Sequence, residues 1–158
     1  MDRQQLGELI LASSETMYRV AKSLLRRDAE CEDAISEAIV KAFEKIHTLR
    51  FDRYGKTWLI RILMNECYKI MRREQKTVSL EEYPLEGKTE EGEDYSELYQ
   101  AISKLPADMR LCITLYYVEG YSVKEIGEIL KVTESTVKNR LSRARKRLKN
   151  ELGEEVQG

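Results

Sequence analysis

The residues with the clearest chemical character lie between Glu134 and Lys149, where seven cations accompany a single acid. Ion pairs along a helix cannot neutralise such a surface, because too few carboxylates are present. Lysine and arginine bind phosphate oxygens, whereas asparagine, serine and arginine can also hydrogen-bond base edges. The stretch therefore favours nucleic-acid binding over the simpler alternative for a charge run, a solvated helix face.

Two short helices separated by a tight turn are expected to position these cations, within residues 121–149. Ser122 followed three residues later by Glu125 is a capping-box pattern, and Thr133 is a good N-cap for the second helix. Gly127 suits a place where two helices cross closely. The second helix is expected to bury a row of apolar residues, Val137, Leu141, Ala144, Leu148 and Leu152. This is the layout of a helix-turn-helix whose second helix enters a DNA major groove.

Another basic helix is expected after a loop over residues 49–56, with Gly55 closing the loop and Thr57 as the N-cap. Its predicted buried stripe consists of Trp58, Leu59, Ile62, Leu63, Cys67, Ile70 and Met71. Its polar stripe, at steps of four, four and three, consists of Arg61, Asn65, Lys69 and Arg72. Asparagine is a poor helix-interior residue, so Asn65 among cations is suited to bonding a base, with a solvated face as the alternative.

The distribution of charge is more informative than its sum, which is −1. Residues 53–76 hold seven cations and two acids, whereas residues 81–97 hold eight acids and Lys88. Residues 77–95 also break the helical spacing and contain Pro84, Gly87 and Gly92. That composition predicts a flexible acidic linker between two basic segments.

Helical spacing elsewhere predicts an all-α fold. A first amphipathic helix is expected over residues 6–25, or two helices with a break near Ser13 and Ser14, and another helix is expected over residues 28–46. After Pro106 the chain predicts a helix that is apolar nearly all round and is capped by Gly120. We expect two small helical domains, 1–76 and 96–152, joined by the acidic linker 77–95 and followed by a frayed tail, 153–158.

Catalytic and metal-binding motifs are absent from the sequence, so we expect neither enzyme activity nor a metal or other cofactor. His47 is the only histidine, and Cys31, Cys67 and Cys112 lie far apart, which predicts three buried thiols rather than a ligand set or disulfides. No apolar run approaches the roughly 18 residues that span a bilayer, and the N-terminus lacks a signal pattern. We therefore expect a cytoplasmic protein without membrane insertion.

Three stretches, in this order across the acidic linker, resemble a small sigma-70-type initiation factor of the extracytoplasmic-function (ECF) group over nearly the whole chain. Residues 32–43 (EDAISEAIVKAF) are similar to the family's EDLVQETFLKAW helix. Residues 58–65 (WLIRILMN), followed by Arg72 and Arg73, resemble its WLxxIxxN…RR segment. Leu105 and Pro106, together with residues 121–148, resemble its second conserved domain. The resemblance implies a region 2-like helical bundle followed by a region 4-like helix-turn-helix.

The resemblance also implies roles for individual residues of the first domain. In the family the first of these helices docks on the coiled coil of the polymerase clamp, which points to Asp33, Ser36, Glu37 and Lys41. The second segment reads and helps to melt the minus-ten promoter element, which points to Arg61, Asn65, Arg72 and Arg73. The loop 49–56 would form part of the pocket for a flipped base.

For the second domain the resemblance implies binding to the minus-thirty-five element. Asn139, Ser142 and Arg143 would face bases. Thr136 belongs to the matched motif, and phosphate contacts would come from Lys138, Arg140, Arg145 and Lys146. Core RNA polymerase (clamp and flap), promoter DNA and an anti-sigma factor are the implied partners.

Three departures from the family pattern bear on promoter preference: Lys69 at a common Asp position, Ala34 where Leu is usual, and Phe43 where Trp is common. The linker would thread the polymerase cleft as an acidic mimic of RNA, or act as a plain tether. Two other functions stay open from the residues alone. One is a stand-alone dimeric helix-turn-helix regulator that binds a palindromic site, and the other is an interaction protein that sequesters a partner.

Overall fold

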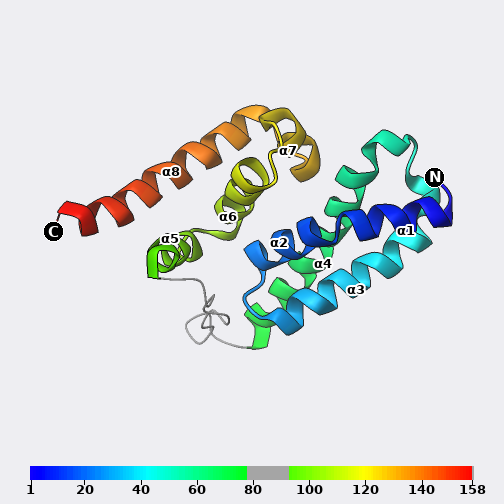
Figure 1. Cartoon of the computed structure of the whole chain (residues 1–158), viewed down its shortest axis with the longest axis horizontal. Helices are drawn as coiled ribbons and strands as arrows, with labels where there is room; N and C mark the ends of the chain where they lie inside the picture. Colours follow the sequence, from blue (N-terminus) through cyan, green and yellow to red (C-terminus); the bar gives the residue numbers. More distant parts are fainter. Residues whose placement is uncertain (78–92, 158) are drawn as a thin grey trace. The chain divides into compact units, whose positions relative to one another are not determined.

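The computed structural model describes residues 1–77 and 93–157, and within them every regular element is a helix (Figure 1). The chain divides into two compact units, Met1–Pro84 and Leu85–Gly158. The predicted all-α class is confirmed. Most of the predicted linker, residues 78–92, lies outside the described residues, and with it most of the acidic stretch expected to mimic RNA or to act as a tether.

The first unit contains four α-helices: α1 (Arg3–Ala12), α2 (Ser14–Leu24), α3 (Asp28–Glu44) and α4 (Gly55–Thr77). Ser13 separates α1 from α2, so the predicted break is confirmed. Asp2 caps α1 in a capping box with Gln5, whose backbone N–H donates to the Asp2 carboxylate at 2.8 Å. Two short 3-10 turns, Ile46–Thr48 and Asp52–Tyr54, connect α3 to α4.

Helix α4 is the centre of the first unit and contacts α1, α2 and α3. Its buried side chains include Leu59, Ile60, Leu63, Met64 and Cys67, so burial extends to Ile60 and Met64, beyond the stripe that the sequence predicts. Helix α3 packs chiefly against α4 and buries three alanines fully, Ala34, Ala38 and Ala42. Alanines allow two helix backbones to approach closely, which holds the polar edges of α3 and α4 side by side.

The start of α4 differs from the sequence-based expectation. The helix begins at Gly55, so Thr57 lies inside its first turn and is not the N-cap. Gly55 has φ −56°, an ordinary helical value, and it is buried. A Cβ at this position would lie 3.0 Å from Cδ2 of Leu9. Gly55 therefore lies in close packing against the side chain of Leu9 in α1, and it does not close a loop.

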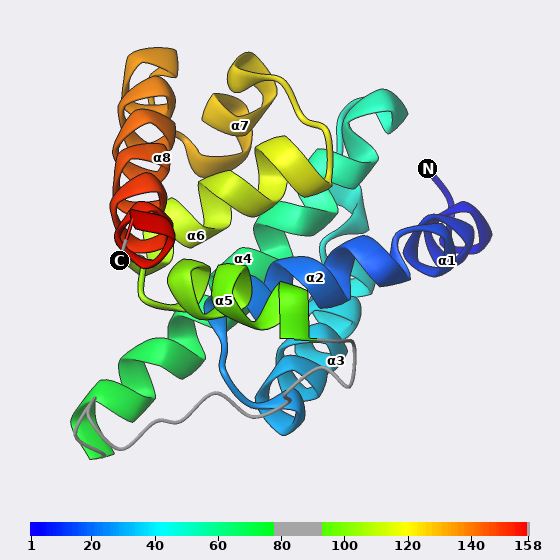
Figure 2. The ribbon, with the colours of Figure 1, turned by 60° about the vertical axis from the view of Figure 1, so that its left-hand side comes forward.

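The second unit contains α5 (Glu93–Ser103), α6 (Ala107–Ile113), α7 (Val123–Leu130) and α8 (Glu134–Gln157), and a π-helical turn, Thr114–Val118, continues α6. Figures 1 and 2 show α7 folded back beside the beginning of α8. The core between α6, α7 and α8 is formed by Leu111, Cys112, Leu115, Ile126, Ile129, Val137, Leu141 and Ala144.

Two expectations for this unit are wrong. Helix α5 begins at Glu93, inside the predicted linker. Helix α8 continues to Gln157, through Gly153 and most of the predicted tail. In the π-helical turn that continues α6, Leu115 is buried, whereas Tyr116, Tyr117 and Val118 are exposed.

Candidate nucleic-acid interface

The polar face of α4 is exposed along most of its predicted length. Asn65, Lys69, Arg72 and Arg73 are exposed, whereas Arg61 is half-buried. The aliphatic residues on the other faces of α4 fix its rotation, because turning the helix would bring Leu63 or Cys67 into water. The predicted minus-ten residues are therefore presented together along one exposed edge, with Arg61 at its more buried end.

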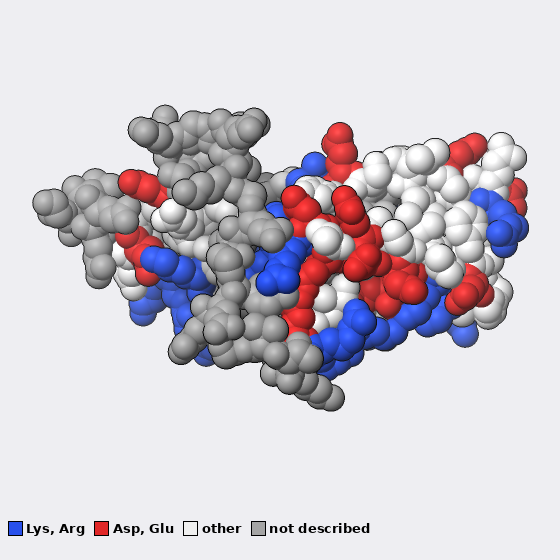
Figure 3. Space-filling view, turned by 90° about the horizontal axis from the view of Figure 1, so that it is seen from below, with Lys and Arg blue, Asp and Glu red and all other residues white. Residues whose placement is uncertain are grey.

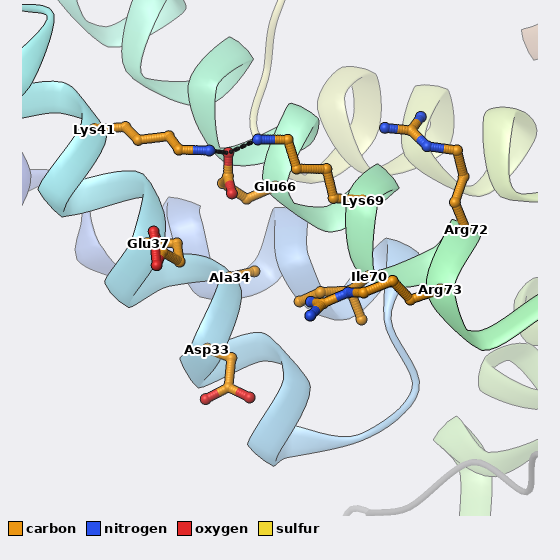
Figure 4. A pocket seen from close by; sticks show the side chains of 9 residues that line it. All are labelled: Asp33, Ala34, Glu37, Lys41, Glu66, Lys69, Ile70, Arg72 and Arg73. Atoms are coloured by element: carbon orange, nitrogen blue, oxygen red, sulfur yellow. Dashed lines mark hydrogen bonds and ion pairs between the residues drawn. The ribbon is translucent and has the colours of Figure 1, made fainter. Parts of the chain in front are cut away.

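A buried carboxylate lies behind this edge. The side chain of Glu66 is only 8% exposed, and its Oε2 accepts hydrogen bonds from Nζ of Lys41 at 2.6 Å and from Nζ of Lys69 at 3.3 Å (Figure 4). Burial raises the pKa of Glu66, but the hydrogen bonds and charges of the two lysines outweigh it, so the pKa lies below its ordinary value. The hydrogen bond to Glu66 in turn raises the pKa of Lys41.

This cluster gives Lys41 and Lys69 a contact within the chain, the carboxylate of Glu66. Lys41, which the resemblance assigns to polymerase contact, extends from α3 across to α4 (Figure 4). Lys69, at the position where the family commonly has Asp, neutralises a buried acid of this chain. A lone buried carboxylate is costly unless it is paired, so both lysines help Glu66 to stay ionised inside the helix pair.

A groove of about 870 Å³ separates the polar edges of α3 and α4. Its α3 wall carries Asp33, Glu37 and Lys41, and its α4 wall carries Glu66, Lys69, Arg72 and Arg73 (Figure 4). Ser36, the other predicted polymerase contact, is exposed on α3. Figure 3 shows acidic side chains gathered into a patch that is bordered by a row of basic side chains. The groove thus brings part of each predicted set together: Asp33, Glu37 and Lys41 of the polymerase-binding set lie opposite Arg72 and Arg73 of the minus-ten set.

Further along the same helices lies a smaller cavity of about 340 Å³. Four cations, one carboxylate and two other polar side chains line it together with Ile62: Lys41, Lys45, Lys69, Arg72, Glu66, Asn65 and Tyr68. Neither Lys45 nor Glu66 is among the sequence-predicted site residues. The periodicity of the sequence could have indicated Lys45, which follows Lys41 by four residues, but the pairing of Glu66 depends on packing between helices.

The turn before α4 carries exposed aromatic side chains. The guanidinium of Arg53 lies over the rings of Phe51 (5.3 Å) and Tyr54 (4.9 Å), and both rings are largely exposed. Trp58 is only half-buried, and its indole N–H donates to Oγ1 of Thr48 at 3.1 Å. Aromatic and guanidinium faces can stack on unpaired bases, which agrees in chemistry with the predicted role of residues 49–56.

In the second unit the predicted caps of the helix-turn-helix are confirmed. The backbone N–H of Glu125 donates to the Ser122 hydroxyl at 3.1 Å, and that of Ser122 donates to the Glu125 carboxylate at 3.0 Å. The backbone N–H of Thr136 donates to Oγ1 of Thr133 at 3.1 Å. Satisfying these terminal N–H groups fixes where α7 and α8 begin.

The turn between α7 and α8 is as tight as predicted. Lys131 adopts the left-handed conformation, with φ 57°, and the Val132 backbone N–H donates to the Gly127 carbonyl at 3.0 Å. A Cβ on Gly127 would lie 2.9 Å from the carbonyl oxygen of Val132. Gly127 is therefore required by the turn backbone that passes over it, rather than by a second helix.

Helix α8 presents most of its predicted DNA contacts to solvent, namely Lys138, Asn139, Ser142, Arg143, Arg145 and Lys146, whereas Thr136 is half-buried. Two arginines of α8 contact other elements of the unit: Arg140 contacts α6, and Arg145 contacts the π-helical turn that follows α6. Nε of Arg140 lies 3.5 Å from Oδ2 of Asp108, and Nη1 of Arg145 donates to the Tyr117 hydroxyl at 3.0 Å. Asp108 offsets the charge of Arg140, whereas the neutral phenol leaves that of Arg145 intact. Neither partner is evident from the sequence, because both contacts are tertiary.

The cysteines are buried thiols, as predicted. Burial raises the pKa of the Cys31 thiol to about 11 and that of Cys67 to about 12. Burial also raises the pKa of Cys112. Thiols that stay protonated at neutral pH are poor nucleophiles and poor metal ligands.

Residues 1–77 and 93–157 contain no group of three or more His, Cys, Asp or Glu side chains arranged to hold a metal ion. None of their helices combines the length and apolar character that crossing a membrane requires.

Comparison with known proteins connects the two basic helices to one family. Residues 9–77 match the family described as Sigma-70 region 2, and residues 95–148 match Sigma-70, region 4. The ECF RNA polymerase sigma factor SigM of Mycobacterium tuberculosis is 31% identical over 155 residues, which cover 96% of this chain and 79% of that protein. RNA polymerase sigma factor SigV of Bacillus subtilis is 28% identical over 163 residues, which cover 98% of each chain.

A solved structure agrees with these relatives. The sigma factor RpoE of Bartonella quintana, crystallised in complex with the anti-sigma factor NepR, has a TM-score of 0.80 and 28% identity, covering 95% of this chain and 98% of its own. Helix order, two separate region matches and relatives matched over most of their length all lead to the same assignment. The chain belongs to the ECF group of sigma-70-family RNA polymerase sigma factors.

Proposed function

We propose that this chain binds core RNA polymerase reversibly and directs it to promoters, with the first unit acting on the minus-ten element and the second unit on the minus-thirty-five element. The observation that carries the proposal is the presence of two exposed basic helix edges, on α4 and α8, in two separate compact units. A stand-alone regulator would need only one of them. The protein itself catalyses no chemistry in this scheme, and it works in the cytoplasm with polymerase.

In the first unit, Asp33, Ser36 and Glu37 on α3 are proposed to dock on the polymerase clamp, and α4 is proposed to contact the minus-ten element through Asn65, Arg72 and Arg73. Asp33 and Glu37 lie on one wall of the larger groove, and Arg72 and Arg73 lie on the other. Docking of α3 would therefore bring α4 to the DNA at a fixed place on the enzyme. The flap of polymerase and an anti-sigma factor are further proposed partners.

In the second unit, α8 is proposed to enter the major groove of the upstream element. Asn139, Ser142 and Arg143 are proposed to face base edges, and Lys138, Arg145 and Lys146 to contact phosphates. Arg140 is a weaker candidate than its neighbours, because Asp108 already offsets its charge.

Transcription in vitro tests the proposal. Core polymerase is supplied with genomic DNA fragments, with and without the chain, and the products are mapped. We expect discrete start sites only when the chain is present. The absence of any discrete transcript, or tight binding of the chain alone to a palindrome as a dimer, would contradict the proposal and favour the stand-alone regulator.

The polymerase surface has its own test. Glu37→Lys reverses an exposed charge on the proposed docking helix, and Glu8→Lys reverses an exposed charge on α1 as the matched control. We expect Glu37→Lys, but not Glu8→Lys, to compete less well with the wild-type chain for core polymerase. If the two variants compete equally well for core polymerase, the docking surface does not include Glu37 on α3.

A further inference from the structure

Helix α3 changes character along its length. Asp33 and Glu37 line the larger groove but not the smaller cavity beside α4, whereas Lys41 lines both and Lys45, one turn later, lines only the smaller cavity. The resemblance treats residues 33–41 as a single polymerase-binding surface. In the structure the charge of α3 changes along the helix, from acidic at Asp33 and Glu37 to basic at Lys41 and Lys45.

The smaller cavity is strongly cationic. Lys41, Lys45, Lys69 and Arg72 line it, and Glu66 is the single carboxylate among its lining residues. Glu66 already bonds both Lys41 and Lys69, so it does not compensate Lys45 or Arg72. An excess of positive charge in a concave site attracts an anion with several oxygens.

The buried carboxylate also orders the site. Glu66 holds the amino groups of Lys41 and Lys69 toward one point, and the side chain of Lys69 is still half exposed. Less side-chain entropy is lost when an anion binds donors that are already held in place. Asn65, whose amide can bond a base edge, lines the same cavity.

We infer that the C-terminal half of α3 belongs to the DNA-binding surface, and that Lys41, Lys45, Lys69 and Arg72 bind the phosphodiester backbone of the strand whose bases α4 reads. This inference rests on the proposed function and assigns Lys41 to DNA instead of polymerase. Phosphate contacts of this kind position a strand without reading its sequence.

Lys45→Gln is the sharpest variant, because Lys45 is exposed at the C-cap of α3 and the ion pairs of Glu66 do not include it. The matched control is Arg19→Gln, which removes an exposed cation from α2. Both variants are used as full-length chains bound to core polymerase. Thermal unfolding of each chain checks that the fold is unchanged.

Two affinities are measured for each variant. The first is competition with the wild type for core polymerase. The second is binding of the assembled enzyme to a single-stranded oligonucleotide that carries the non-template minus-ten sequence of a transcribed fragment, over a range of salt concentrations. We expect Lys45→Gln to keep its affinity for core polymerase and to weaken oligonucleotide binding about threefold to tenfold. The plot of log affinity against log salt concentration should become less steep by about 0.7, because one phosphate contact is lost. Arg19→Gln should change neither affinity.

The outcomes separate the possible errors. Loss of core affinity with unchanged DNA binding would make the basic half of α3 a polymerase surface and overturn the inference. If Lys45→Gln changes neither its affinity for core polymerase nor oligonucleotide binding, the inference is also overturned. The proposed function would still stand in that case, provided that the wild-type chain directs transcription. If the wild type directs no transcription, the proposed function fails and the inference fails with it.

Discussion

Helices α4 and α8 both carry a basic edge, but they are built into their units in different ways. Helix α4 is enclosed, with Ile60 and Met64 buried in addition to the predicted stripe, so that only a narrow polar edge is left. Helix α8 buries one line of residues, Val137, Leu141 and Ala144, and exposes most of its other side chains over several turns, with Thr136 and Arg140 half-buried.

This difference fits two kinds of DNA contact. A B-form major groove is about 12 Å wide, which admits a helix that protrudes from its domain, as α8 does. Helix α4 cannot protrude, because α3 lies beside its polar edge and forms a groove with it. A groove of this kind suits an extended strand laid along it, so we expect α8 to bind duplex DNA and α4 to bind the opened strand.

The largest effect should come from the enclosed helix. Ile60→Ala removes buried methyl groups from a fully buried side chain and should lower the unfolding free energy of the first unit by about 2–5 kcal/mol. Urea unfolding measures this loss. Leu11→Ala, at a position that is 77% exposed on α1, is the control and should change little. A small effect of Ile60→Ala would mean that α4 is not enclosed.

Glu66→Gln removes the charge that Lys41 and Lys69 share and should cost about 1–3 kcal/mol at neutral pH. The pKa of Glu66 is lowered by folding, so its contribution is present above the ordinary value near 4.5 and is lost as the pH falls through the lower folded pKa. Urea unfolding at a series of pH values should therefore show the wild type and the variant converging in acid. A difference that does not depend on pH would exclude the ionised carboxylate as its cause.

Gly127→Ala tests the turn that sets the angle of α8. The added Cβ would meet the carbonyl oxygen of Val132 at 2.9 Å, so the turn must shift, at a cost of about 1–3 kcal/mol. Binding of upstream duplex by the assembled enzyme should weaken, while binding of the single-stranded minus-ten oligonucleotide should not. Gly7→Ala in α1, where a Cβ meets nothing within 4 Å, should be neutral or stabilising. Equal effects of the two changes would argue against a special role for the turn.

Within α8, the two arginines should differ in kind. Arg143→Ala should cost about 1–3 kcal/mol of binding free energy and relax the sequence preference at one upstream position. Arg145→Ala should weaken binding evenly across sequences and by less. Selection of randomised upstream sites by each assembled enzyme separates these results, and matching profiles would show that the assigned faces are wrong.

Local signals in the sequence account for much of the second unit. Ser122, Glu125 and Thr133 satisfy nearby backbone N–H groups, so their roles follow from spacings of three residues. The extent of α8 was underestimated, because Gly153 does not end the helix. The contacts of Arg140 with Asp108 and of Arg145 with Tyr117 join distant segments, and no local pattern predicts them.

The contacts of the first unit were harder to predict, because they too join segments that are distant in the sequence. The alanines of α3 are evident as a helical stripe, but their result, a close contact that puts Lys41 beside Glu66, depends on which helix packs there. Glu66 appears in the sequence as one acid among cations, with no indication that it is buried. The roles of Asn65, Arg72 and the α8 contacts stay predictions, since they concern DNA.

The most direct measurement of the central claim is permanganate reactivity of promoter thymines in complexes formed with wild-type, Asn65→Ala and Arg143→Ala chains. If α4 binds the opened strand and α8 binds duplex, Asn65→Ala should reduce reactivity at the minus-ten element while upstream footprints persist. Arg143→Ala should weaken the upstream footprint and, through weaker binding, lower thymine reactivity at the minus-ten element. That reactivity should return to the wild-type level when the concentration of the complex is raised. Loss of the upstream footprint with Asn65→Ala, or a melting defect with Arg143→Ala that persists at saturation, would contradict the division of labour between the two helices.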